Sequence, residues 1–173
     1  MKRIALTVAL VGTFVVAGAI GARASVNDSW ITTKAKIVLL TMDGFNVSGA
    51  NVDTVNGNVT IHGKVGTTAD RTRAADTVRK VSGVKTVKNL LQVVPDDVKK
   101  LVASKDSDVK DRVEVSLKTD TKMKDVNVAS VNNGVVLLSG KTDSPNETLR
   151  AIENAYGVNG VHRVASEIQS TEK

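Results

Sequence analysis

The spacing of apolar residues near the start of the chain predicts a helix followed by a β-hairpin. Across residues 28–42, apolar side chains recur at helical intervals and form one stripe: Ile31, Ala35, Val38 and Met42. Residues 50–56 and 58–65 then alternate between apolar and polar positions on either side of Asn56-Gly57. Because Asn-Gly between alternating runs is a strong signal for a two-residue turn, we expect two antiparallel strands here.

A second helix and a third strand complete this first unit. The helix is expected over residues 68–81, with four small or β-branched side chains facing inward: Ala74, Ala75, Val78 and Val81. Gly83 then ends the helix, and a strand over about 84–94 follows. The element order is α-β-β-α-β, in which two helices cover one face of a three-stranded sheet.

The same pattern repeats in the second half of the chain. Residues 55–64 return as residues 131–141 with one extra Asn in the turn, and Gly63 has its counterpart 77 positions later at Gly140. The later helix opens with Ser144, Pro145 and Glu147, which is the pattern of a capped first turn. A last strand over 161–169 follows it.

We therefore predict an α+β fold made of two tandem αββαβ domains. The first domain covers residues 25–95 and the second covers residues 106–173, with residues 96–105 as a linker rich in Asp and Lys. Units of about 65–70 residues lie near the lower size limit for an independent core, so we expect the two copies to pack on each other.

The first 24 residues have the pattern of a secretory signal peptide. Lys2 and Arg3 precede an apolar run over residues 4–20, and the small residues of Ala22-Arg23-Ala24 suit cleavage after Ala24. An uncleaved anchor is the alternative, although the run is short of the roughly 20 residues of a spanning helix. The chain has no Cys to accept a lipid. Export to a bacterial periplasm is expected.

Composition then excludes several classes of function. The absence of Cys rules out disulfides, thiolate metal sites and a cysteine nucleophile. Aromatic residues make up only 2% of the chain, which argues against stacking platforms for single-stranded nucleic acid. Removing the basic residues of the signal peptide lowers the formal net charge from +6 to +3, so charge gives little support for a nucleic-acid partner.

The remaining polar candidates have structural explanations. His62 corresponds to Ser139 in the other copy and His162 to Lys85, so neither imidazole recurs, and both are expected to face solvent. The carboxylates between residues 96 and 111 lack the central Gly and terminal Glu of a calcium loop. We expect Asp106 or Ser107 to cap the next helix instead. We predict no catalytic residues, no metal ligands and no cofactor-binding residues.

The first helices of the two copies differ in a way that suggests a binding surface. Trp30, Ile37 and Leu40 lie off the core stripe of the first helix, whereas the second copy has Asp108, Val115 and Lys118 in their places. Extra apolar surface must meet the other domain, a partner protein or a membrane interface.

The binding residues that we predict are therefore an apolar contact and a cationic border. Trp30, Ile37 and Leu40 form the contact, and Lys34 and Lys36 flank it. Arg71 and Arg73 on the second helix are weaker candidates, because they point to different sides of that helix and acidic residues intervene.

Three sequence elements resemble the BON domain. They are Asp28-Ser29-Trp30-Ile31-Thr32-Thr33-Lys34, the V-x-G-x-V-x-[IL]-x-G hairpin that ends at Gly63, and the Gly-Val-x-x-Val endings that begin at Gly83 and Gly160. Two copies behind a signal peptide are similar to the osmotically inducible periplasmic (OsmY-like) family. The resemblance implies an αββαβ fold, periplasmic residence, a role in envelope or osmotic stress and contact with phospholipid surfaces.

Two functions without catalysis are compatible with this sequence. One is peripheral binding to an anionic phospholipid surface. The other, which some members of the family suggest, is a chaperone that shields apolar segments of exported proteins. Lipidated members of the family have an acceptor Cys, so its absence here means that any membrane contact would be peripheral.

Overall fold

The computed structural model describes residues 26–45 and 49–171, and it contains two sheets of three strands, each with two α-helices. The predicted signal peptide lies outside the described residues. The first domain consists of α1 (Val26–Leu40), β1 (Ala50–Val55), β2 (Asn58–Val65), α2 (Thr68–Arg79) and β3 (Thr86–Val93). The second consists of α3 (Lys99–Lys118), the short 3-10 helix η2 (Thr121–Met123), β4 (Val126–Asn132), β5 (Val135–Thr142), α4 (Pro145–Tyr156) and β6 (Arg163–Ser170).

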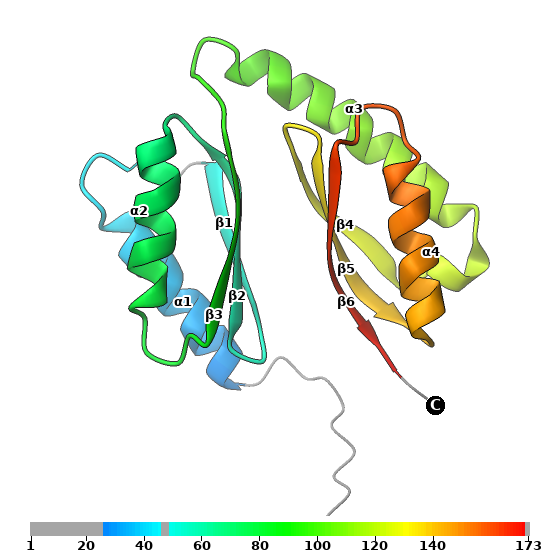
Figure 1. Cartoon of the computed structure of the whole chain (residues 1–173), viewed down its shortest axis with the longest axis horizontal. Helices are drawn as coiled ribbons and strands as arrows, with labels where there is room; N and C mark the ends of the chain where they lie inside the picture. The colour runs from blue at the N-terminus through cyan, green and yellow to red at the C-terminus, as the bar shows by residue number, and fades with distance from the viewer. Residues whose placement is uncertain (1–25, 46–48, 172–173) are drawn as a thin grey trace, which may run out of the picture.

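Both sheets have the same topology, which confirms the predicted αββαβ order. The central strand pairs antiparallel with the strand before it and parallel with the strand after the helix. The hairpins turn at Asn56-Gly57 and Asn133-Gly134, and both asparagines have positive φ angles, which Asn and Gly tolerate better than other residues. In each domain the two helices lie on one side of the sheet (Figure 1).

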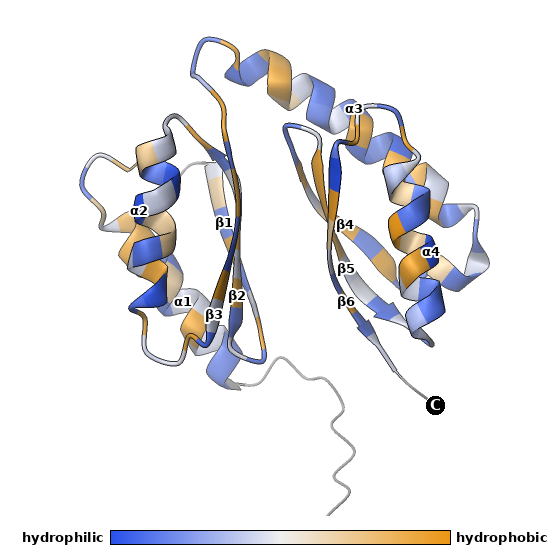
Figure 2. Ribbon diagram, in the orientation of Figure 1, coloured by the Kyte–Doolittle hydropathy of each residue, from blue (hydrophilic) through white to orange (hydrophobic). Residues whose placement is uncertain are grey.

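The core of the first domain lies between α1, α2 and the helix-facing side of its sheet. Ile31, Ala35 and Leu39 of α1 are buried against residues such as Ile61 of β2, and polar and apolar positions alternate along the strands (Figure 2). The predicted stripe placed Val38 and Met42 where the structure fully buries Leu39. Since α1 ends at Leu40, Met42 lies beyond the helix, and its side chain is only partly buried against the core.

The second domain confirms two further expectations. Val109, Val113 and Leu117 are the buried stripe of its first helix. At the start of α4, the Ser144 hydroxyl accepts a hydrogen bond from the Glu147 amide at 3.3 Å. Glu147 in turn accepts from the Asp143 amide at 3.0 Å, so the first turn of α4 has reciprocal caps.

The start of α3 corrects the expectation that Asp106 or Ser107 caps it. The helix begins at Lys99, and no side chain caps it at Val98. Residues 99–105 contain no Gly or Pro, so nothing in this segment stops the helix from continuing. Asp106 therefore lies inside α3, where it is only 5% exposed.

The two sheets pack on each other through the faces that carry no helices (Figure 1). Leu90 of β3, Leu137 of β5 and Ala165 of β6 form a small buried cluster at this junction. The Lys64 ammonium lies 2.7 Å from the Asp106 carboxylate and ties the end of β2 to α3. Packing between the copies, expected from their small size, is thus present.

This packing also overturns the prediction that both histidines face solvent. His162 is exposed, but His62 is only 5% exposed because it lies on the face of β2 that the second sheet covers. Its Nε2 lies 2.8 Å from Asp53 on the neighbouring strand. The hydrogen bond from His62 lowers the pKa of Asp53 below its usual value of 3.8, burial opposes this shift, and the charges of His62 and Lys36 add to it.

Asp53 makes part of the stability dependent on pH. A carboxyl with a lowered pKa stabilises the fold above its unfolded pKa, and this contribution disappears as the pH falls through the folded pKa. Asp53→Asn should therefore reduce the loss of stability on going from about pH 6 to about pH 3, by less than about 1 kcal/mol because the side chain is partly exposed. Urea unfolding at the two pH values measures this, and an equal loss in both proteins would contradict it.

Candidate ligand-binding face

The first helix presents a second apolar side to solvent. Trp30, Ile37 and Leu40 are 60%, 52% and 64% exposed, and helical geometry places them on one strip opposite Ile31 and Ala35. We call this strip of three residues the α1 face. The alternative that it packs against the second domain is wrong, because the sheets supply the junction and α1 lies on the outer side of its sheet (Figure 1).

The four predicted cationic residues do not all border this face. Lys34 lines the same pocket as Trp30. Lys36 lies one helical turn before Leu40, and its charge also acts on Asp53 of β1. Arg73 donates to the Asp43 carbonyl oxygen at 2.7 Å, beyond the end of α1, and Arg71 lies in the first turn of the same helix, α2, which starts at Thr68. Lys34 is therefore the residue that the structure brings together with Trp30.

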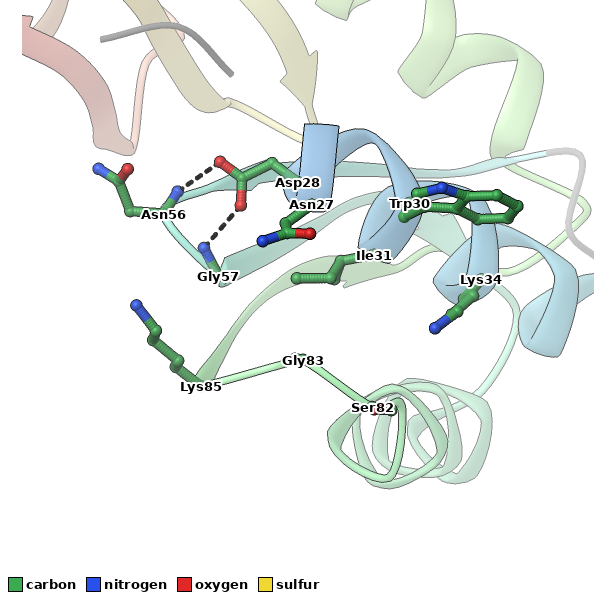
Figure 3. A pocket seen from close by; sticks show the side chains of 10 residues that line it. All are labelled: Asn27, Asp28, Trp30, Ile31, Lys34, Asn56, Gly57, Ser82, Gly83 and Lys85. Carbon is green, nitrogen blue, oxygen red and sulfur yellow. Dashed lines mark hydrogen bonds between the residues drawn. The ribbon is translucent and has the colours of Figure 1, made fainter. Parts of the chain in front are cut away.

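The pocket beside Trp30 lies where the start of α1 meets the turns of the sheet (Figure 3). It has a volume of about 650 Å³. The buried Asp28 carboxylate accepts hydrogen bonds from the amides of Asn56 and Gly57, both at 2.8 Å, and so fixes α1 onto the hairpin turn. This contact places Trp30 and Lys34 next to the loop between α2 and β3.

Lys85 is a further cationic residue of this pocket and is not among the binding residues predicted from the sequence. Its amide donates to the Gly57 carbonyl oxygen at 2.9 Å, which holds it against the hairpin turn. In Figure 3, Lys85 approaches the pocket from one side, while Lys34 and Trp30 lie on the other. The sequence signal for Lys85 is its correspondence to His162 in the second copy, at the repeat spacing of 77 residues.

The chemistry of this region suits binding of an anion next to an apolar surface. Two ammonium groups and one indole surround a pocket whose carboxylate already accepts two backbone amides. An indole combines an apolar ring with an N–H donor, which favours the boundary between water and an apolar phase. Within residues 26–45 and 49–171, acidic, His and Cys side chains nowhere form a group of three that could hold a metal ion.

No helix in the described part of the chain is long and apolar enough to cross a membrane. The α1 face and the pocket beside it meet at Trp30.

Comparison with known proteins identifies the family, whereas the solved structures that it finds are only weakly similar. Two solved structures of CdsD, a structural protein of the type III secretion system of Chlamydia trachomatis, share 16% and 11% sequence identity with this chain, each with a TM-score of 0.33. The matches cover 82% and 79% of this chain, and 65% and 90% of those chains. The chain thus spans slightly less than two thirds of the first of them, and similarity this weak says nothing about function.

A model of the BON domain matches the chain at two places. The matched residues are 27–95 and 105–172, so each match covers one αββαβ unit, without the first residue of α1 in the first and without residues 99–104 of α3 in the second. Both matches include the hairpin and the Gly-Val-x-x-Val ending that carried the resemblance in the sequence. The chain therefore belongs to the BON-domain family, with two BON domains in tandem.

Proposed function

We propose that this protein binds peripherally to anionic phospholipid surfaces through the α1 face and the cationic residues beside it. The single observation that carries the proposal is the exposure of Trp30, Ile37 and Leu40 on one strip. We further propose that the N-terminal segment directs the chain to the periplasm, where it acts in envelope and osmotic stress. Family membership supports this assignment, since BON domains are known from envelope proteins that contact phospholipid.

Hydrophobic and electrostatic terms would act together at such a surface. Burying an aliphatic side chain in an apolar phase contributes about 1.5–3 kcal/mol, and a Lys near an anionic leaflet adds about 1 kcal/mol. Lys34 and Lys85 lie at the end of α1 that carries Trp30. The indole would therefore reach the headgroup boundary where the two cations meet the phosphates.

A titration that follows the emission of Trp30 tests the proposal, because it is the one Trp of the chain. The protein without residues 1–24 keeps every residue that the structure describes. Its emission should shift to the blue with phosphatidylglycerol vesicles and not with phosphatidylcholine vesicles. The affinity should fall as salt rises from about 0.01 M to about 0.15 M, because the screening length shortens from about 30 Å to about 8 Å.

A double variant tests whether vesicle binding depends on the α1 face or on exposed apolar side chains in general. Ile37→Ser with Leu40→Ser should weaken binding to phosphatidylglycerol vesicles at least about tenfold, since two aliphatic contacts are lost while Trp30 still reports. The matched control is Leu149→Ser with Tyr156→Ser on α4, which removes two side chains that are 54% and 62% exposed. The control should bind as the unchanged protein does.

Two results would count against lipid binding at this face. One is Trp30 emission that no vesicle changes, and the other is an equal loss of affinity in the α4 control. A chaperone would instead suppress aggregation of an unfolded apolar client without lipid, with little dependence on salt. If the double variant lost that activity and vesicles had no effect, the chaperone function would replace the lipid-binding one.

A further inference from the structure

The second domain has a pocket at the place that corresponds to the one beside Trp30. It lies between α3, the β4–β5 turn and the loop between α4 and β6, and its volume is about 580 Å³. We call it the second-domain pocket. Its polar lining includes Lys105, Arg112 and His162.

The same backbone contacts build both pockets. The Asp106 carboxylate accepts from the amides of Asn133 at 2.9 Å and Gly134 at 3.1 Å, as Asp28 does at the first hairpin turn. The His162 amide donates to the Gly134 carbonyl oxygen at 2.8 Å, as Lys85 does to Gly57. The two pockets are therefore equivalent in structure as well as in sequence spacing.

The polar positions of the two pockets correspond in their chemistry, whereas the apolar position does not. Arg112 stands where the first domain has Lys34, and His162 where it has Lys85. Asp108 replaces Trp30. The second-domain pocket thus keeps donors for an anion and lacks the side chain that would enter an apolar phase.

Contacts with the first domain reduce the negative charge inside the second-domain pocket. The Asp106 carboxylate is paired with the Lys64 ammonium at 2.7 Å in addition to its two amide donors. Arg112 donates through Nη2 to the Asn159 carbonyl oxygen at 3.0 Å, which orients the guanidinium and leaves its other N–H groups available. Lys105 and Arg112 are exposed cations, so the exposed Asp108 is opposed by two positive charges.

We propose that the second-domain pocket binds a phosphate group, with Arg112, His162 and Lys105 as its ligands. A planar guanidinium matches the oxygens of phosphate, and an imidazole N–H adds a directed donor. The ring of His162 packs directly on Gly134, where a Cβ atom would collide with it, so this donor has a fixed position. The inference extends the proposed function by giving the second domain its own anion site.

The two pockets lie at opposite ends of the molecule. The β1–β2 turn is at the bottom of Figure 1 and the β4–β5 turn is at the top. The Lys64–Asp106 pair agrees with this arrangement, because it joins the end of β2 that is far from its own turn to the second-domain pocket. A phosphate bound in the second domain would therefore lie away from the surface that the α1 face contacts.

Amide NMR signals of glycine residues test the second site separately from the first. In ¹⁵N-labelled protein, Gly134 and Gly160 report on the second-domain pocket, and Gly57 and Gly83 report on the pocket beside Trp30. Inorganic phosphate is one probe, and phosphatidylglycerol vesicles are the other. We expect the amide signals of Gly134 and Gly160 to shift or broaden in a saturable way. A response to phosphate alone identifies a soluble phosphate as the ligand. A stronger response to vesicles identifies a lipid headgroup as the ligand.

Variants show whether the pocket itself is responsible. Arg112→Gln with His162→Gln should weaken the response at Gly134 and Gly160 at least about tenfold, because charge-assisted hydrogen bonds are lost. Gly57 and Gly83 should respond as before. The matched control is Lys118→Gln with Lys124→Gln, which removes two exposed cations of the same domain outside the pocket.

Three results would overturn the inference. They are the absence of any response at Gly134 and Gly160 to either probe, a response that the double variant retains, and an equal loss in the Lys118 and Lys124 control. Failure of the proposed function has a different signature, namely Trp30 emission that phosphatidylglycerol vesicles leave unchanged. Each site can therefore fail without the other.

Discussion

Replacement of Gly140 by Ala is expected to destabilise the second domain by about 4 kcal/mol or more, which is the range of severe single substitutions. Gly140 has a φ angle of +120°, which side-chain-bearing residues rarely adopt. An added Cβ would also lie 2.0 Å from the Asp125 carbonyl oxygen across the hairpin, so the two strands would have to separate. Urea unfolding followed by circular dichroism measures the loss.

The control for this substitution is Gly157→Ala at the end of α4. Gly157 has a φ angle of −68°, and the nearest heavy atom to an added Cβ would be the Glu153 carbonyl oxygen at 3.5 Å. Its effect should stay within about 1 kcal/mol, because Ala fits both the backbone and the space. Gly63→Ala in the first domain should behave as Gly140→Ala does, since its φ is +128° and its Cβ would collide with Gly49. Equal stabilities of Gly140→Ala and Gly157→Ala would refute this account.

Asp106→Ala should lower the free energy of unfolding by about 3–5 kcal/mol, the cost of breaking a buried ion pair by removing one partner. The substitution removes the acceptor of the Asn133 and Gly134 amides. It also leaves the Lys64 ammonium, whose side chain is 14% exposed, without its counter-charge at the domain junction. Both hairpin and junction would therefore be weakened, and urea unfolding would report the combined effect.

Two further variants apportion this effect. Asp108→Ala, at an exposed position two residues further along α3, should change stability by no more than about 0.5 kcal/mol. Lys64→Met combined with Asp106→Ala should cost less than the sum of the single changes, because each single variant leaves one charge unpaired and the double variant leaves none. Additive costs would show that Lys64 and Asp106 are not coupled.

Local sequence patterns were sufficient for most of the secondary structure. The two Asn-Gly hairpin signals and the inward positions Ala74 and Val78 of α2 depend on neighbours in sequence, and the structure agrees with them. The boundaries of helices and strands shifted, most of all at α3, which begins at Lys99, and Leu39 replaces Val38 and Met42 in the buried stripe of α1. A helix continues through any segment without a stop signal, so its start is less strictly encoded than its buried stripe.

The candidate site was only partly predictable, because some of its residues are close in sequence and others are not. Trp30 and Lys34 are four residues apart on one helix, so their proximity follows from sequence. Lys85 reaches the same pocket from a distant loop, and Arg73 is drawn to the end of α1 by the Asp43 carbonyl oxygen. Contacts between distant segments depend on how helices and turns meet, and charge clustering along the chain does not encode that.

The sequence by itself determined the repeat, the αββαβ order of each copy and the existence of a second apolar side on the first helix. These features follow from periodicity and turn chemistry, which act over a few residues. Only the tertiary structure decided which surfaces of the copies meet. The helix-free faces pack together, which buries His62, engages Asp106 with Lys64 and leaves Trp30 exposed. The physical reason is that a face becomes buried only where another segment packs on it. Here that segment lies far away along the chain, so a pattern over a few residues does not encode which face is buried.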